Sequence, residues 1–284
     1  MPPHDTPQAK KGTASASYYN AFTLCYYDFH VLGHNMTYIW RCPTRQHQLP
    51  LFQAHFWQQP KHDDGQGEKI PMERKGRIWE QLDIGAGTGY FVAEALQHCL
   101  HNMDSEAVPR NPMRITLMDI NMSSLSKARK RVEGILNRTD RKDLVGVATM
   151  HHDVLDLNMP RDKGLRGYDV VTMFNLLHCL RTITPQDKKK AFQFAARALK
   201  DDGALVGCTI LPGREYQGTG LAGVRARYTL WLYNRVYKVF GNEGDTQEEF
   251  EKGLKAHFQE VKVSVVGSMM LFVARRPKRL GMRT

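Results

Sequence analysis

Three glycines at alternate positions follow an apolar strand end that carries an acid. The segment Gln81–Gly89 reads Gln-Leu-Asp-Ile-Gly-Ala-Gly-Thr-Gly, and an amphipathic run from Tyr90 to Leu100 follows it. Glycine is needed where the backbone turns sharply and a ligand approaches closer than a Cβ would permit. A helix that begins directly after such a turn directs its free N–H groups at the ligand. The pattern therefore predicts a nucleotide-type cofactor at this turn.

Spacing and charge at the turn distinguish between cofactors. A dinucleotide fingerprint has the form G-x-G-x-x-G, whereas here Gly89 comes one residue early and Tyr90 follows it. The carboxylate of Asp83 would repel a pyrophosphate but attract an ammonium group, and S-adenosylmethionine (SAM) carries an ammonium, a sulfonium and no phosphate. The pattern D-x-G-x-G-x-G resembles the first motif of the Rossmann-like SAM-dependent methyltransferases, which makes the following residues candidate cofactor contacts: Asp83, Gly85, Ala86, Gly87, Gly89 and Tyr90. The alternative is a tight strand–helix turn that binds nothing.

A second acid ends the next predicted strand. Ile115 to Asp119 is an apolar run that finishes in a carboxylate. In a βαβ unit an acid at the end of the second strand lies beside the ribose and accepts hydrogen bonds from its hydroxyls. Asp119 is therefore predicted to bind the ribose, and Ile120, Asn121 and Met122 are expected along one side of the adenine.

The third predicted strand leads into a further acid. Val145 to Met150 is a short apolar run, and Asp153 follows it closely. In the methyltransferases that this chain resembles, an acid at this place accepts from the exocyclic amine of adenine. Asp153 and Val154 are therefore candidate adenine contacts, with Asp156 as the competing acid.

The fourth strand, Tyr168 to Phe174, is a clear apolar run. The carboxyl end of a central strand is where an open α/β sheet forms its crevice, so Asn175 and Leu176 are expected near the methionyl part of SAM. His178 follows in the next turn, within reach of both cofactor and substrate, and a neutral imidazole there could act as a general base. The alternative is a histidine whose hydrogen bonds are satisfied at a helix start.

These elements predict an α/β fold with a doubly wound, seven-stranded, mostly parallel sheet and one antiparallel strand. Helices are expected at 90–100, at 122–138 with Lys127, Arg129, Lys130 and Arg131 on a solvated face, and at 185–199. Lys200 to Gly203 is predicted to be a turn. The fifth strand is expected at 204–211 and a closing pair at 261–266 and 268–274.

An aromatic segment precedes the glycine turn, with Phe22, Tyr26, Phe29 and Leu32 on one helical face. It is similar to the leader of a family of small methyltransferases common in fungal and actinobacterial secondary metabolism. The resemblance falls on these residues: Tyr19, Leu24, Tyr27, Asp28, Val31, Leu32, Gly33, Trp40, Cys42, Pro43 and Thr44. It implies a cofactor contact at Tyr19.

Later blocks match the same family, and the resemblance covers residues 18–275. They are Leu177–Leu180, Leu232–Asn234, Phe240–Asn242, Val265–Gly267 and Leu271–Phe272. The chain departs from the family after Leu180, where Arg181-Thr182 stands in place of the usual Pro-Gly, and in a polar insertion between Trp57 and Ile78.

The long connection from Pro212 to Asp245 carries the second aromatic cluster. Long connections in compact domains are often functional, and ligand pockets favour aromatic walls with few polar groups. We expect this segment, called the cap (residues 212–245), and the leader (residues 18–57) to roof the crevice. The candidate substrate-pocket residues are Phe22, Tyr26, Tyr228, Trp231 and Arg235. The alternative is that these aromatics only pack the cap onto the sheet.

The predicted organisation is a single methyltransferase domain at 18–275 between two polar ends. Residues 1–17 are expected to be disordered. The domain divides into the leader at 18–57, a polar loop at 58–77, a SAM-binding core at 78–211, the cap at 212–245 and a closing helix and hairpin at 246–275, and a basic tail follows at 276–284.

Bulk properties restrict the class of protein. The net charge is +11, but the basic residues are scattered rather than interleaved with aromatics on one element, so no nucleic-acid partner is expected. Five cysteines without a C-x-x-C pair favour a reducing compartment. No apolar stretch has the length of a membrane span, and we expect a cytoplasmic protein. His151 and His152 lack a second cluster at metal-ligand spacing, so they are interpreted as loop residues and no metal is expected.

The sequence therefore predicts transfer of the SAM methyl group to an oxygen, nitrogen or carbon of a small, largely apolar natural product. One alternative is a SAM-fold protein without methyl transfer, acting as a pericyclase-like cyclisation pocket or binding a partner. Another is an RNA or protein methyltransferase, which the scattered charge disfavours. The glycine spacing disfavours a dehydrogenase.

Overall fold

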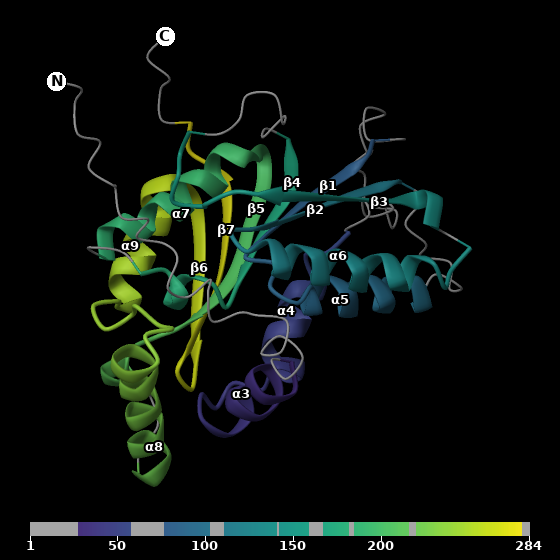
Figure 1. The fold of residues 1–284 in the computed structure, drawn as a ribbon. Helices are drawn as coiled ribbons and strands as arrows, with labels where there is room; N and C mark the ends of the chain where they lie inside the picture. Colours follow the sequence, from purple (N-terminus) through teal and green to yellow (C-terminus); the bar gives the residue numbers. More distant parts are fainter. Residues whose placement is uncertain are drawn as a thin grey trace, which may run out of the picture.

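The computed structural model describes residues 28–57, 77–102, 111–140, 142–158, 167–181, 185–215 and 220–279. Its centre is a seven-stranded sheet with the order β3-β2-β1-β4-β5-β7-β6 (Figure 1). The strands are β1 Trp79–Ile84, β2 Met113–Asp119, β3 Val145–His151, β4 Tyr168–Phe174, β5 Leu199–Ile210, β6 Phe258–Val266 and β7 Met269–Pro277. The ends of the chain, including the predicted disorder at 1–17, lie outside these residues.

One strand runs against the others, as predicted. The pairs β1–β2, β1–β4, β2–β3 and β4–β5 are parallel, whereas β7 is antiparallel to both β5 and β6. The strand order reverses between β1 and β4, because the chain returns there after building the β1–β3 half. In open α/β sheets the crevice for a ligand lies outside the carboxyl ends of the strands at such a reversal.

Helices cover both faces of the sheet and produce two hydrophobic cores (Figure 1). On one face lie α5 (Tyr90–His101) and α6 (Met122–Leu136), and on the other lie α7 (Pro185–Ala198) and α9 (Gln247–His257). The apolar positions of α6 form the expected buried stripe, which comprises Leu125, Ala128, Val132 and Leu136. Short 3-10 turns, η5 (Lys142–Leu144) and η7 (Leu177–Cys179), precede β3 and follow β4.

The described part of the leader and the cap extend beyond the same end of the sheet (Figure 1). The leader forms η1 (Asp28–Asn35), α3 (Met36–Tyr38), η2 (Thr44–Gln48) and α4 (Leu49–Gln53), and the cap forms η8 (Gly213–Glu215), α8 (Gly220–Trp231) and η9 (Leu232–Val236). The two segments meet where Asn35 Nδ2 donates to the Tyr233 hydroxyl at 3.0 Å. The ring of Trp40 also packs 6.2 Å from that of Phe240.

The predicted turn at Lys200–Gly203 is wrong, because β5 already begins at Leu199. Tyr168 pairs with Leu199 and Val170 pairs with Ala204, so the register shifts between the two strands. The four residues Lys200–Gly203 therefore form an irregularity within the β4–β5 pairing and not a turn before the strand. Within the described ranges, no helix is both long and apolar enough to cross a membrane.

Gly207 in β5 tests how closely the central strands pack. A Cβ at this position would lie 2.3 Å from the Met173 carbonyl oxygen and 2.6 Å from Phe272 Cζ. Gly207→Ala should therefore lower the free energy of unfolding by about 1–3 kcal/mol. Gly134→Ala in α6 is the matched control, because a Cβ there meets nothing within 4 Å, and it should stabilise the protein by up to about 1 kcal/mol. Urea denaturation monitored by circular dichroism measures both, and equal effects would contradict the tight packing.

Candidate functional site

The glycine turn between β1 and α5 has the backbone geometry that only glycine adopts readily. Gly85, Gly87 and Gly89 have φ values of +74°, +52° and +71°. A Cβ on Gly89 would lie 2.9 Å from the Cα of Ala128 in α6, and one on Gly85 would lie 3.0 Å from Leu176 Cδ1. The glycine turn is therefore held between Leu176, in the turn after β4, and the body of α6.

Asp119 at the end of β2 faces this turn. Its Oδ2 accepts from the Gly87 N–H at 3.0 Å, and its Oδ1 accepts from the Asn121 N–H at 2.8 Å. Burial raises the pKa of the carboxyl group, and these backbone donors oppose the rise. The Ile120 N–H also donates to this carboxylate. Because an ionised carboxylate has about four lone-pair sites, it can still accept a further hydrogen bond. Asn121 in turn caps α6 by accepting from the Ser123 N–H at 2.8 Å.

Asp83 is a buried carboxylate on the neighbouring strand, opposite Thr172 in the register of β1 and β4. Thr172 Oγ1 donates to Asp83 Oδ1 at 2.6 Å. Burial raises the pKa of Asp83 to about 7, which the Thr172 hydrogen bond opposes and the nearby Asp119 charge supports. A cation brought to this position would restore the ionised form. The ammonium of SAM fits this requirement.

The end of β3 presents Asp153 and two histidines. Asp153 Oδ1 accepts from the Leu155 N–H at 2.9 Å, which closes a local turn around the buried Val154. His151 Nε2 lies 2.9 Å from the Ile120 carbonyl oxygen, and His152 Nε2 lies 3.0 Å from that of Asp156. Across the part of the chain that the structure describes, no group of three or more His, Cys, Asp or Glu residues could hold a metal.

Asn175, directly after β4, connects the crevice to the leader. It has a φ of +56°, a conformation that asparagine tolerates better than most side chains. Its Nδ2 donates to Gln48 Oε1 at 2.9 Å, and both residues are buried. The adjacent Leu176 is the residue that packs against Gly85. The turn after β4 therefore contacts the leader and the glycine turn together.

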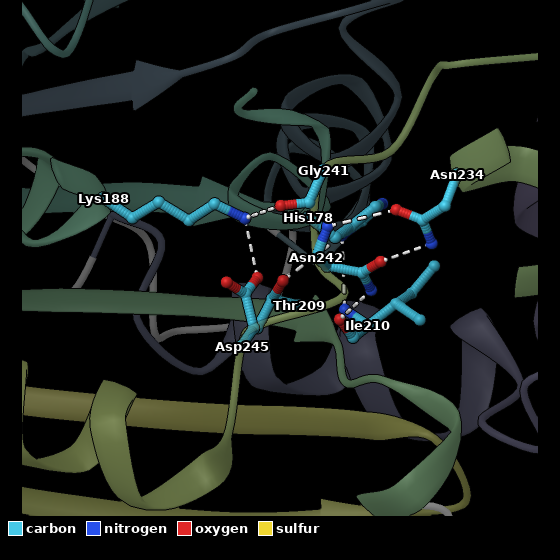
Figure 2. A network of polar contacts seen from close by, with 8 residues as sticks. All are labelled: His178, Lys188, Thr209, Ile210, Asn234, Gly241, Asn242 and Asp245. Carbon is cyan, nitrogen blue, oxygen red and sulfur yellow. Dashed lines mark hydrogen bonds and ion pairs between the residues drawn. The ribbon is translucent and has the colours of Figure 1, made fainter. Parts of the chain in front are cut away.

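His178 is buried, with 3% of its surface exposed. Its Nδ1 accepts from the Ile210 N–H at 3.2 Å (Figure 2). Its ring also packs edge-on against that of Phe240, with centroids 4.6 Å apart. Burial, assisted by the Lys188 charge, lowers the pKa of the imidazole to about 3, so the ring is neutral at physiological pH. This geometry matches the alternative of a satisfied histidine, and the general-base role stays a prediction.

The predicted substrate residues divide into two groups. Phe22 and Tyr26 lie outside the described residues, as does Tyr19, a predicted cofactor contact. In the cap, Tyr228 and Trp231 are 59% and 52% exposed and stack on one another with centroids 6.0 Å apart. Arg235 pairs with Glu243 at 2.7 Å. These three side chains are thus exposed on the surface of the cap. Their contact with substrate stays a prediction.

The structure adds a clamp on the glycine turn that sequence reasoning missed. Asp28 in the leader accepts from Thr88 Oγ1 at 2.6 Å and pairs with Arg131 of α6 at 2.6 Å. Arg131 also donates to the Thr88 carbonyl oxygen at 3.2 Å and lies over the Tyr90 ring. The prediction that Arg131 belongs to a solvated face is therefore wrong, because the leader brings an acid to it. The signal was available in the leader block, which includes Asp28.

Comparison with known proteins agrees with this geometry. Residues 82–205 match the family model described as a methyltransferase domain. Methyltransferase verB of Penicillium polonicum is 32% identical over 264 residues, covering 93% of this chain and 98% of that protein. The physcion biosynthesis cluster O-methyltransferase of Aspergillus chevalieri is 31% identical over 261 residues, covering 92% of this chain and 94% of that protein. A solved structure from Bordetella parapertussis, described as a possible exported protein, shares the fold with a TM-score of 0.51 at 16% identity over 70% of this chain and 62% of that one.

The sheet order and the glycine turn, together with these similarities, define a class I SAM-dependent methyltransferase. The chain belongs to the methyltransferase family that includes the Penicillium protein. SAM is its cofactor. The predicted family, fold, cofactor and enzyme class are therefore confirmed.

Asp83 gives the free protein a predictable dependence on pH. Because its pKa is raised from 3.8 to about 7, the folded chain holds a proton between about pH 4 and 7 that the unfolded chain has lost, so stability falls as the pH rises through this window. The full effect is at most on the order of 4 kcal/mol. Asp83→Asn should flatten this fall and raise the melting temperature at pH 8 without SAM.

Thermal melts at pH 5 to 8.5, followed by circular dichroism, check this expectation. Asp140→Asn on the exposed turn after α6 is the control for the loss of one negative charge. If Asp83→Asn and wild type show the same slope, the carboxyl group of Asp83 is ionised in the folded protein throughout this range.

Proposed function

We propose that this enzyme methylates an oxygen atom of a small, largely apolar natural product. Asp119 accepts a hydrogen bond from the glycine turn, and Ala86 of that turn belongs to the same hydrophobic cluster as Trp40 and Phe52 of the leader and Phe240 of the cap. That combination suits a cationic methyl donor beside an apolar acceptor. Oxygen is proposed because a relative covering nearly the whole chain is named as an O-methyltransferase of a biosynthesis cluster.

The residues around the turn are assigned to the parts of SAM by their chemistry. Asp119 would accept from the ribose hydroxyls, Asp83 would compensate the ammonium group, and Asp153 would accept from the adenine amine. Further proposed contacts are Gly85, Ala86, Gly87, Gly89, Tyr90, Ile120, Asn121, Val154, Asn175 and Leu176. SAM, when bound, supplies an electrophilic methyl group on a sulfonium.

The reaction is a substitution at that methyl carbon. The acceptor oxygen forms the new bond to carbon, the carbon–sulfur bond breaks, and its electron pair stays on sulfur. The hydroxyl proton leaves to a base or to solvent. Alignment of the reacting atoms in a site that excludes water supplies much of the rate in such reactions. The rings of Trp40, Tyr233 and Phe240, which pack together where leader and cap meet, would help to exclude water.

A labelled-transfer assay tests the proposal. The purified protein is incubated with methyl-labelled SAM and an organic extract of the organism that makes it, and products are identified by mass spectrometry. A labelled methyl ether in the extract supports O-methylation. Label on carbon or nitrogen corrects the accepting atom. Label only on added RNA or protein, or SAM binding with no transfer, favours the alternative functions.

Asp119 tests the assignment of the cofactor site. Its carboxylate would receive charge-assisted hydrogen bonds worth about 1.5–3 kcal/mol each, so Asp119→Ala should weaken SAM binding at least about tenfold. Calorimetry on folded protein measures the affinity. Asp143→Ala in the exposed η5 turn is the control. An unchanged affinity in Asp119→Ala would remove this residue from the cofactor site.

His178 tests whether the turn after β4 supplies a base. A general base typically contributes about 10²–10⁴-fold to the rate. His178→Asn retains an acceptor in place of Nδ1, so a residue with only a structural role should keep most of the transfer rate at saturating SAM. The buried geometry predicts this outcome. A rate loss of two or more decades, with SAM affinity preserved, would instead assign the base role to His178.

A further inference from the structure

A buried polar network joins the cap to the turn after β4 (Figure 2). We call five of its side chains the cap latch: His178, Lys188, Asn234, Asn242 and Asp245. They come from η7, from α7 and from the second half of the cap. The Thr209 hydroxyl also belongs to the network, 3.3 Å from His178 Nδ1. The latch thus brings together three blocks that match the family but lie outside the glycine turn, namely Leu177–Leu180, Leu232–Asn234 and Phe240–Asn242.

Two asparagines close the cap upon itself and onto β5. Asn234 Nδ2 donates to Asn242 Oδ1 at 2.9 Å, and the Asn242 N–H donates to Asn234 Oδ1 at 3.3 Å. Asn242 Nδ2 donates to the Ile210 carbonyl oxygen at 3.0 Å. The Asn242 side chain therefore joins Ile210, at the end of β5, to Asn234 of the cap.

Lys188 fixes the same segment from the opposite side. Its Nζ donates to the Gly241 carbonyl oxygen at 2.8 Å and pairs with Asp245 Oδ2 at 2.7 Å. Both side chains of the pair are only 1% exposed. A buried ion pair contributes little net stability compared with apolar residues of the same size, but the loss of one partner leaves an uncompensated charge. In this protein the pair, together with the Gly241 contact, joins the 241–245 segment to α7.

The Gly241 backbone is enclosed on its other side by the turn after β4. The Gly241 N–H donates to the His178 carbonyl oxygen at 2.9 Å, and a Cβ on Gly241 would lie 3.0 Å from the Arg181 Cα. A shift of this segment would therefore disturb several contacts together. The helix η9 lies immediately before the Gly241 segment and contacts the leader through Tyr233. The latch therefore fixes the positions of both η9 and the Gly241 segment.

The latch and the cofactor turn rest on different contacts. Lys188 binds Gly241 and Asp245, whereas the glycine turn is held by Asp119, Leu176 and Ala128. We propose that Lys188 and Asp245 are positioning residues for the methyl acceptor, which hold the cap in the place where it forms the acceptor's wall. This inference rests on the proposed function of the cap as part of the substrate site.

Removal of one charge separates this role from SAM binding. In Lys188→Met, amide hydrogen exchange at 232–245 should accelerate at least tenfold, and SAM affinity by calorimetry should stay within about twofold. In the labelled-transfer assay with an extract dilution series, the half-saturating amount of extract should rise at least fivefold. Lys189→Met is the matched control, because it breaks the neighbouring surface pair with Glu249 and should change none of these quantities.

A double variant distinguishes positioning from stability. Lys188→Met/Asp245→Leu removes both buried charges and should recover thermal stability, but Gly241 still lacks its donor, so exchange and extract dependence should stay altered. If hydrogen exchange and extract dependence both return to their wild-type values when thermal stability is recovered, the ion pair has only a structural role and the proposal fails. The proposal also fails if Lys188→Met leaves both hydrogen exchange and extract dependence unchanged. It fails as well if Lys188→Met weakens SAM binding as much as it raises the half-saturating amount of extract. Asp245→Asn replaces Lys188→Met in these tests if Lys188→Met does not fold. The exchange readout stays informative if wild type transfers no label, which would count against the proposed function alone.

Discussion

The close approach of backbone at the glycine turn is the constraint on which the rest of the site depends. A Cβ on Gly89 would lie 2.9 Å from the Cα of Ala128, which leaves no room for it, and a Cβ on Gly85 would press on the Leu176 side chain at 3.0 Å. This contact brings the ends of β1, β2 and β4 to one point, where the Gly87 N–H donates to Asp119. A side chain at Gly89 would have to displace the backbone of α6, and at all three positions the positive φ disfavours any residue other than glycine.

The leader contacts this turn directly, and the cap contacts the leader. Asp28 holds Thr88 and Arg131, and Gln48 holds Asn175, so the leader contacts both edges of the crevice. The cap reaches the leader through Tyr233. Electrostatic interactions are stronger where water is excluded, and the same enclosure that would bind an apolar acceptor therefore strengthens the effect of Asp83 and Asp119 on a cationic donor.

Charge is buried in two different ways in this protein. Lys188 and Asp245 compensate each other within the fold. Asp83 has Thr172 as its described hydrogen-bond donor and no described cation beside it, and burial raises its pKa to about 7. The pair satisfies itself in the free protein, whereas the single carboxylate is satisfied best when a cation arrives. The first arrangement is suited to fixing a segment, and the second is suited to binding a positively charged ligand.

The sequence by itself determined the sheet, its antiparallel strand, the glycine turn and the strand-end position of Asp119, because strand periodicity and glycine conformation are local properties. It did not determine the surroundings of His178, which looked accessible after β4 but is enclosed by Phe240 and Ile210 from later segments. Nor did it reveal the partner of Arg131, which comes from the leader. Burial and pairing depend on which distant segments meet, and only the tertiary structure decides that.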